Sequence, residues 1–65
     1  MISVRSSVIS AIDYDGDLLI LYIKFTSGYV YKYYRVPESV FIGLLEARSK
    51  GTFFNSRIKE RYRSS

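Results

Sequence analysis

The sequence predicts an α+β fold: a three-stranded antiparallel β-meander followed by two short α-helices packed on one sheet face (βββαα). Turn signals at Asp15-Gly16 and Thr26-Ser27-Gly28 separate three runs of β-prone residues. The chain's one proline, Pro37, ends the third run. Beyond it, apolar residues recur every three to four positions, which is the spacing of amphipathic helices. The 65 residues are enough for one domain, spanning residues 1–65.

Two hairpins are expected to join the three strands. The expected strands span residues 8–14, 18–26 and 29–36. Asp15-Gly16 is typical of a two-residue turn, and such a turn would pair Ile12 with Leu19. The residues before the first strand form a lead-in, so we expect the two ends of the domain, 1–6 and 63–65, to be loosely ordered.

The second hairpin decides which tyrosines are buried. A three-residue loop with Gly28 in a left-handed bulge would place Leu21 opposite Tyr33. A two-residue turn would instead bury Lys32, and an unpaired buried lysine is costly. The three-residue loop gives a core face of Leu19, Leu21, Ile23, Phe25, Tyr29, Tyr31 and Tyr33. The opposite face carries Leu18, Ile20, Tyr22, Lys24, Val30, Lys32 and Tyr34. We therefore expect Tyr31 and Tyr33 to be mostly buried and Tyr22 and Lys24 to be mostly exposed.

Two helices are expected after Pro37, whose fixed φ suits a first helical turn. The first helix buries a stripe of Val40, Phe41, Leu44 and Leu45. It ends within residues 48–51, where Gly51 can serve as a left-handed cap. The second helix spans about residues 53–62, and its core-facing residues are Phe54, Ile58 and Tyr62.

Composition argues against an enzyme and against a metal site. The chain has no cysteine, so it lacks a thiolate nucleophile or metal ligand. It has no histidine either, which removes the commonest general base and the commonest metal ligand. Asp13, Asp15 and Asp17 resemble the opening of a calcium loop. However, the glycine is fourth rather than sixth, and Lys24 stands where the bidentate glutamate belongs. We expect no catalysis, no cofactor and no metal. No apolar run reaches the length of a membrane span, so a cytoplasmic protein is expected.

Basic charge is concentrated near the C-terminus. Residues 1–47 hold four basic and five acidic side chains, for a net charge of −1, whereas residues 48–65 hold six and one, for +5. Such asymmetry is typical of nucleic-acid binding, and tyrosines beside lysines on a sheet face can stack on bases. The residues expected to contact nucleic acid are Tyr22, Lys24, Lys32, Tyr34, Arg35, Lys50, Arg57, Lys59, Arg61 and Arg63.

A second interpretation treats the chain as a protein-interaction or homodimerisation module. Leu18, Ile20, Tyr22 and Tyr34 could form an apolar patch on the outer sheet face, and such patches mark partners. The basic helix would then serve only to keep the protein soluble. Salt dependence separates the two interpretations, because phosphate contacts weaken steeply with salt while apolar contacts do not.

The central motif also resembles a known family. The pattern G-x-x-Y-x-Y-x-x-V-P is similar to the centre of the KTSC domain, a small module found at the C-terminus of some lysyl-tRNA synthetases and as a free-standing protein. Here its positions are Gly28, Tyr31, Tyr33, Val36 and Pro37. Ser6-Ser7, Tyr14-Asp15 and the run from Ala47 to Asn55, which contains Gly51 and Phe54, resemble further family positions. The resemblance covers about residues 4–62, and the synthetase context implies that RNA is favoured over DNA.

Overall fold

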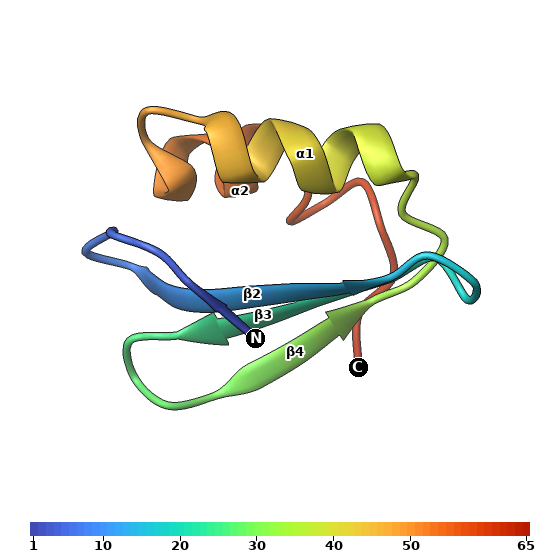
Figure 1. Ribbon diagram of the computed structural model, residues 1–65, viewed down its shortest axis with the longest axis horizontal. Coiled ribbons are helices and arrows are strands. Elements are labelled where there is room, and N and C mark those ends of the chain that lie inside the picture. The colour runs from blue at the N-terminus through green and yellow to red at the C-terminus, as the bar shows by residue number, and fades with distance from the viewer.

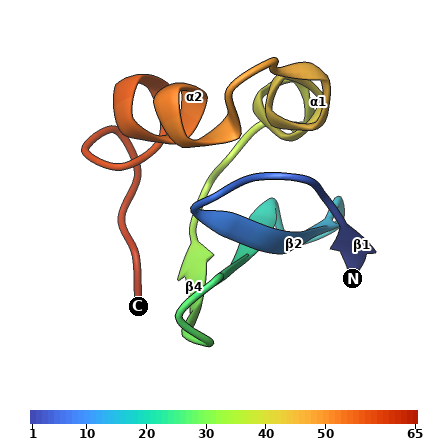
Figure 2. The same cartoon turned by 90° about the vertical axis from the view of Figure 1, so that its left-hand side faces the viewer.

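A sheet of antiparallel strands carries both helices on one of its faces (Figure 1). The computed structural model describes all residues, 1–65. The elements are β1 (Ile2–Ser3), β2 (Ile9–Asp15), β3 (Ile20–Phe25), β4 (Val30–Tyr33), α1 (Glu38–Glu46) and α2 (Lys50–Arg57). The strands are ordered β1-β2-β3-β4 in the sheet, and the view in Figure 2 shows the two helices side by side above it. The predicted α+β class and the placement of both helices on one face are confirmed.

The sheet has four strands, so the predicted count of three is wrong. The additional strand, β1, is only two residues long and pairs Ile2 with Ile12 and Ser3 with Ala11. Two residues carry no readable alternation, and for that reason the sequence pattern missed them. The C-terminal end also pairs with the sheet: Tyr33 forms a bridge with Ser64, and the Ser65 amide donates to the Lys32 carbonyl at 3.0 Å. Both ends, expected to be loosely ordered, thus make backbone contacts with the sheet.

The turn between β2 and β3 differs from the prediction. Four residues, Gly16 to Leu19, connect the strands, and Leu19 adopts a left-handed φ of 57°. The Asp15 carboxylate accepts from the Asp17 and Leu18 amides at 3.0 and 3.1 Å, so it stabilises this longer turn. Ile12 consequently pairs with Ile23 rather than Leu19. The shift is four residues, an even number, and therefore keeps Ile12 on the core face. A bulge between Ile9 and Ala11 changes the register near the start of β2, so Ile9 is buried beside Ile12 while Val8 is exposed.

The turn between β3 and β4 is the predicted three-residue loop. Gly28 has a φ of 102°, and the Phe25 amide donates to the Tyr29 carbonyl at 2.8 Å. The resulting pairs include Leu21 with Tyr33 and Tyr22 with Lys32. Arg35, at φ 57°, ends the extended segment soon after β4, so the strand is shorter than predicted.

The core lies between the sheet and the helices. Its nine buried members are Ile9, Ile12, Leu21, Ile23, Tyr33, Val36, Leu44, Phe54 and Ile58. Leu19, predicted to join them, is exposed because it belongs to the turn. Tyr14 links the layers: its ring stacks on Phe41 at 5.0 Å, and its hydroxyl donates to the Val36 carbonyl at 2.5 Å. Burial, with smaller contributions from the carboxylates of Glu38 and Asp15, raises the pKa of Tyr14.

The helix boundaries shift toward the N-terminus relative to the prediction. α1 ends at Glu46, and the Lys50 ammonium donates to the carbonyls of Leu45 and Ala47 at 3.1 and 2.9 Å, satisfying the end of that helix. Ser49 is the N-cap of α2 and accepts from the Thr52 amide at 3.2 Å.

Gly51 lies in the first turn of α2, so its predicted role as a cap is wrong. It instead lets Val8 approach: a Cβ at this position would lie 3.3 Å from a Val8 methyl group. α2 ends at Arg57, and residues 58–62 form turns, so the expected basic C-terminal helix is mostly a looped return segment. Neither helix has the length and hydropathy needed to cross a membrane.

Candidate nucleic-acid interface

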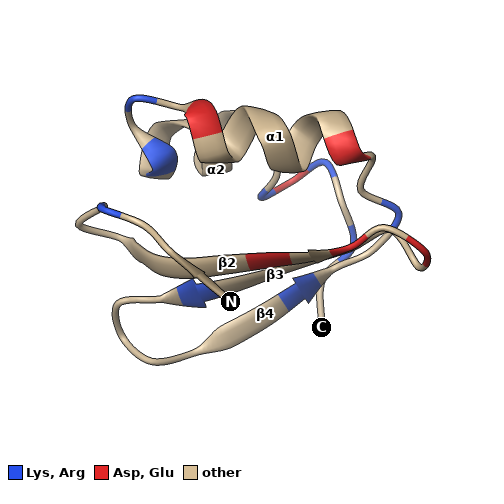
Figure 3. Ribbon diagram, viewed as in Figure 1, with Lys and Arg blue, Asp and Glu red and all other residues tan.

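The lysines and arginines are distributed over several parts of the molecule rather than gathered on one surface (Figure 3). Basic residues occur in the segment before β2, in β3, β4, the segment after β4, the loop between the helices, α2 and the C-terminal segment. Each group therefore has to be examined in its own surroundings.

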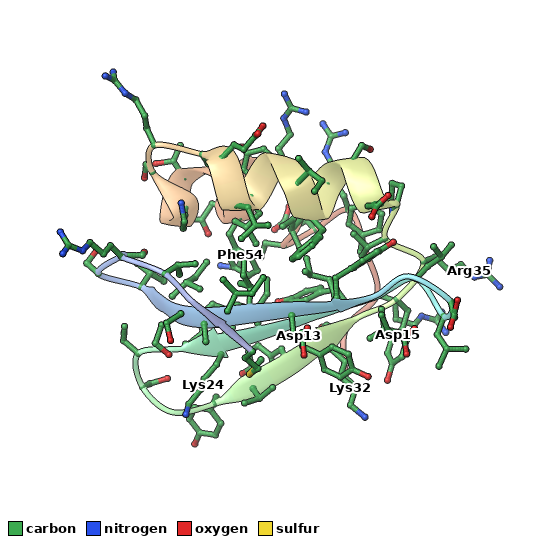
Figure 4. All side chains as sticks on the ribbon, viewed as in Figure 1. Asp13, Asp15, Lys24, Lys32, Arg35 and Phe54 are labelled. Atoms are coloured by element: carbon green, nitrogen blue, oxygen red, sulfur yellow. The ribbon has the colours of Figure 1, made fainter.

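The segment after β4 and the C-terminal segment together line a hollow of about 670 Å³. We call it the C-terminal hollow, and its lining residues are Tyr34, Arg35, Arg61, Tyr62 and Arg63. The two segments are held together because the Tyr34 amide donates to the Arg63 carbonyl at 2.9 Å. The left-handed φ of Arg35 turns the chain there, and Figure 4 shows that side chain at the end of the sheet, pointing outward. Three arginines and two tyrosines line this one space, and no acidic residue lines it.

The outer face of the sheet carries a second group of predicted residues. Tyr22 lies between Asp13 on β2 and Lys32 on β4. The Lys32 ammonium sits 5.9 Å from the centre of the Tyr22 ring, within the range of a cation–π contact. Lys24 pairs with Val30 one row further along, and Figure 4 shows both lysines on the face away from the helices. Asp13 in this row offsets part of the positive charge, which makes the outer face less basic than the C-terminal hollow.

Two other predicted phosphate contacts are engaged within the molecule. Lys50 donates to the end of α1, and the Arg57 guanidinium lies 5.7 Å from the centre of the Phe53 ring. Lys50 also borders a polar cavity of about 410 Å³ at the start of α2, together with Arg5 and Arg48. No function was predicted for these two arginines, because Arg5 lies in the lead-in and Arg48 at a predicted helix end.

An aromatic groove of about 460 Å³ opens beside the start of β4 and was not predicted as a site. It is lined by Ser7, Val8, Phe25, Thr26, Ser27, Tyr29, Tyr31, Tyr33, Phe54 and Lys59. Tyr33 is buried as predicted, but Tyr31 is 42 % exposed, so its predicted burial is wrong. Tyr31 lies on β4, the last strand in the sheet order, and its ring contacts Phe25 edge-on at 5.4 Å. Burial, with a smaller contribution from Tyr31, raises the pKa of Tyr33.

The predicted residues thus fall into separate places. The structure brings Tyr34, Arg35, Arg61 and Arg63 together in the C-terminal hollow, and it adds Tyr62 to them. Tyr22, Lys24 and Lys32 stay on the outer face, while Lys59 borders the aromatic groove. Tyr62 is the fourth residue after Ile58, and this spacing led the sequence analysis to assign it to the core alone.

Comparisons with known proteins agree on one family. Residues 5–62 match the family model of the KTSC domain. A protein of Tsukamurella paurometabola is 48% identical over 61 residues, which cover 94% of this chain and 91% of that protein. A segment of the lysine–tRNA ligase of Nostoc punctiforme is 42% identical over 59 residues, 91% of this chain but only 10% of the ligase.

The fold agrees as well. The crystal structure of a KTSC domain protein from Yersinia pestis matches with a TM-score of 0.94 and 38% identity, covering 97% of this chain and 89% of that one. The family match spans the core strands, both helices and the Gly28 turn. This chain therefore belongs to the KTSC domain family.

Proposed function

We propose that this KTSC domain is a small nucleic-acid-binding module that acts by binding alone, with RNA favoured over DNA. The observation that carries the proposal is the C-terminal hollow, where three arginines and two tyrosines share one space without a carboxylate. Guanidinium groups suit phosphates because their donors form a planar fork, and phenol rings can stack on bases. The hollow is therefore complementary to a nucleic-acid backbone in charge and in hydrogen-bond chemistry.

The preference for RNA rests on the similarity to the lysine–tRNA ligase segment. That enzyme's name states that its substrate is tRNA, and the shared region is about a tenth of its length. A segment of this size is suited to an accessory binding domain rather than to the ligase chemistry itself.

Salt-dependent binding tests this proposal. Fluorescence anisotropy with labelled mixed-sequence RNA and DNA single strands gives the affinity at several salt concentrations. If Arg35, Arg61 and Arg63 each neutralise one phosphate, log K falls with log salt at a slope of about −2 for a single strand. We expect Arg61→Ala to flatten the slope by about 0.7.

Arg48→Ala is the matched control, since Arg48 is exposed and lies outside the hollow. It should leave the slope unchanged. Absence of binding at low salt, or equal effects of the two substitutions, would contradict the proposal.

A protein-interaction or homodimerisation module is the second candidate, because apolar residues lie exposed on and beside the outer face. Leu18 is 66 % exposed and Val30 48 % exposed, and Ile20 and Tyr22 lie nearby on β3. Sedimentation at several protein concentrations tests it. This candidate would be favoured if the protein forms a dimer that Leu18→Ser dissociates and if it does not bind nucleic acid.

A further inference from the structure

We infer that the aromatic groove receives unpaired bases, so that the ligand class is single-stranded nucleic acid. This inference rests on the proposed function and deepens it. The hollow alone offers phosphate contacts, which single strands and duplexes both provide. The groove adds aromatic surface, which only bases free of a duplex can reach face-on.

The groove contains exposed rings that are already held in position. Tyr29 is 68 % exposed, and its ring lies nearly parallel to that of Tyr31, at 16° and a centroid distance of 6.4 Å. The Phe25 ring contacts Tyr31 edge-on at 5.4 Å and Phe54 edge-on at 5.2 Å. Because Phe54 is buried, this chain of edge contacts anchors the exposed rings to the core. A base would therefore meet a preformed surface, which lowers the entropic cost of binding.

Residues 59–63 contribute lining residues to both the groove and the hollow. Lys59 lines the aromatic groove, whereas Arg61 and Arg63 line the C-terminal hollow. A strand that follows this segment has a cation at both cavities, and no carboxylate lines either one. Tyr29 and Tyr34 are five residues apart, roughly 17 Å along an extended chain. An oligonucleotide of about ten residues is long enough to occupy both cavities.

Charge complementarity selects this occupant over an apolar peptide. The groove has a lysine on its border, and the separate C-terminal hollow is lined by three arginines. An apolar peptide would offer no anion to these basic side chains, whereas a nucleic-acid strand carries both aromatic bases and phosphates.

A single-tryptophan reporter tests the inference directly. The chain has no tryptophan, so Tyr29→Trp introduces one indole at the exposed side of the groove. Ile42→Trp is the control, because Ile42 is also exposed, at 40 %, but lies on α1 and lines neither cavity. The probes are a ten-nucleotide mixed-sequence RNA single strand, the same sequence as a duplex, and an abasic strand of equal length. We expect the single strand to quench Tyr29→Trp fluorescence, the abasic strand and the duplex to leave it nearly unchanged, and Ile42→Trp not to respond.

Affinity measurements complete the test. Tyr31→Ala should weaken single-strand binding by at least about fivefold and leave the salt slope unchanged, since stacking neutralises no phosphate. Circular dichroism verifies that this partly exposed site tolerates the substitution. Equal affinities for the intact and abasic strands, together with unchanged Tyr29→Trp fluorescence, would contradict base binding in the groove. The proposed phosphate contacts of the hollow would remain. No binding to any probe at low salt would overturn the proposed function and this inference together.

Discussion

The two ends of the segment 29–33, which contains β4, carry the same residue type in very different surroundings. Tyr29, Tyr31 and Tyr33 alternate along one face of one extended segment, yet their exposed fractions are 68, 42 and 4 %. β4 begins well below the helix layer and approaches it only toward its end (Figures 1 and 2). Phe54 of α2 packs edge-on against the Tyr33 ring at 5.7 Å, so α2 closes the core over this end.

The difference shows that strand register assigns a face but does not assign burial. Register pairs Tyr33 with Leu21 and Tyr31 with Ile23 on the helix side, and the Tyr29 ring stacks on that of Tyr31. Sheet twist then carries the start of β4 away from a helix of only eight residues. The covered end of the strand contributes buried surface to the core, whereas the open end leaves its tyrosine rings exposed.

The largest expected effect is at the covered end. Tyr33→Ala should lower the free energy of unfolding by about 3–5 kcal/mol, because it deletes a buried ring that contacts Phe54. A domain of this size could be largely unfolded by such a loss. Urea unfolding of Tyr29→Ala is the comparison, and we expect a change within about 0.5 kcal/mol. Similar losses for the two variants would show that the ends of β4 are not energetically distinct.

The Gly28 turn, at the open end, should give the next largest effect. A Cβ at Gly28 would meet no atom within 4 Å, so Gly28→Val is strained only through its φ of 102°. We expect a cost of about 1–3 kcal/mol, compared with little change for Ser27→Ala. Equal melting temperatures for the two variants would contradict the turn geometry as the source of the cost.

Tyr31 should fall between its two neighbours. Tyr31→Ala removes the edge contact with Phe25 and part of the buried ring surface, which predicts a loss of roughly 1–2 kcal/mol. We expect the loss of unfolding free energy to be largest for Tyr33→Ala, intermediate for Tyr31→Ala and smallest for Tyr29→Ala, because the exposed fractions of these side chains increase in the same order. A Tyr31 loss as large as that of Tyr33 would place Tyr31 in the core after all.

Alkaline titration gives the smallest of these effects. The pKa of Tyr33 is raised by burial, so the folded protein holds this proton to a higher pH than the unfolded chain does. The free energy of unfolding should be unaffected by this group below the ordinary pKa of about 10 and should fall as pH rises above it. Tyr33→Phe should make the decline shallower, with Tyr14 responsible for a remaining part. Thermal melts between pH 8 and 11 measure it, and an unchanged decline would show that Tyr33 is not the group that titrates.

Local chemistry in the sequence predicted the fold class, the Gly28 turn and the burial of Tyr33. The lysine pattern excluded the alternative register, since it would have placed Lys32 in the core. The Asp15 turn was mispredicted because its carboxylate binds two amides beyond Gly16, a geometry that the Asp-Gly pair does not reveal.

The candidate site was less predictable than the fold. The C-terminal hollow forms because the Tyr34 amide bonds to the Arg63 carbonyl, a contact between residues 29 positions apart. Periodicity cannot detect such a contact, because it describes neighbours along one element. The aromatic groove depends on where α2 ends over the sheet, and the sequence placed that end five residues too late.

The C-terminal segment along β4 also bears on solubility. β4 is last in the sheet order, and an uncovered strand edge rich in valine and tyrosine is a template on which another chain can add. Ser64 and Ser65 occupy the half of this edge at Lys32 and Tyr33, leaving only the Val30 half open. Deleting these two serines removes few core contacts, yet it would double the length of unprotected edge. We therefore expect removal of Ser64 and Ser65 to increase self-association through this edge, a change that sedimentation would detect and a melting temperature alone would not.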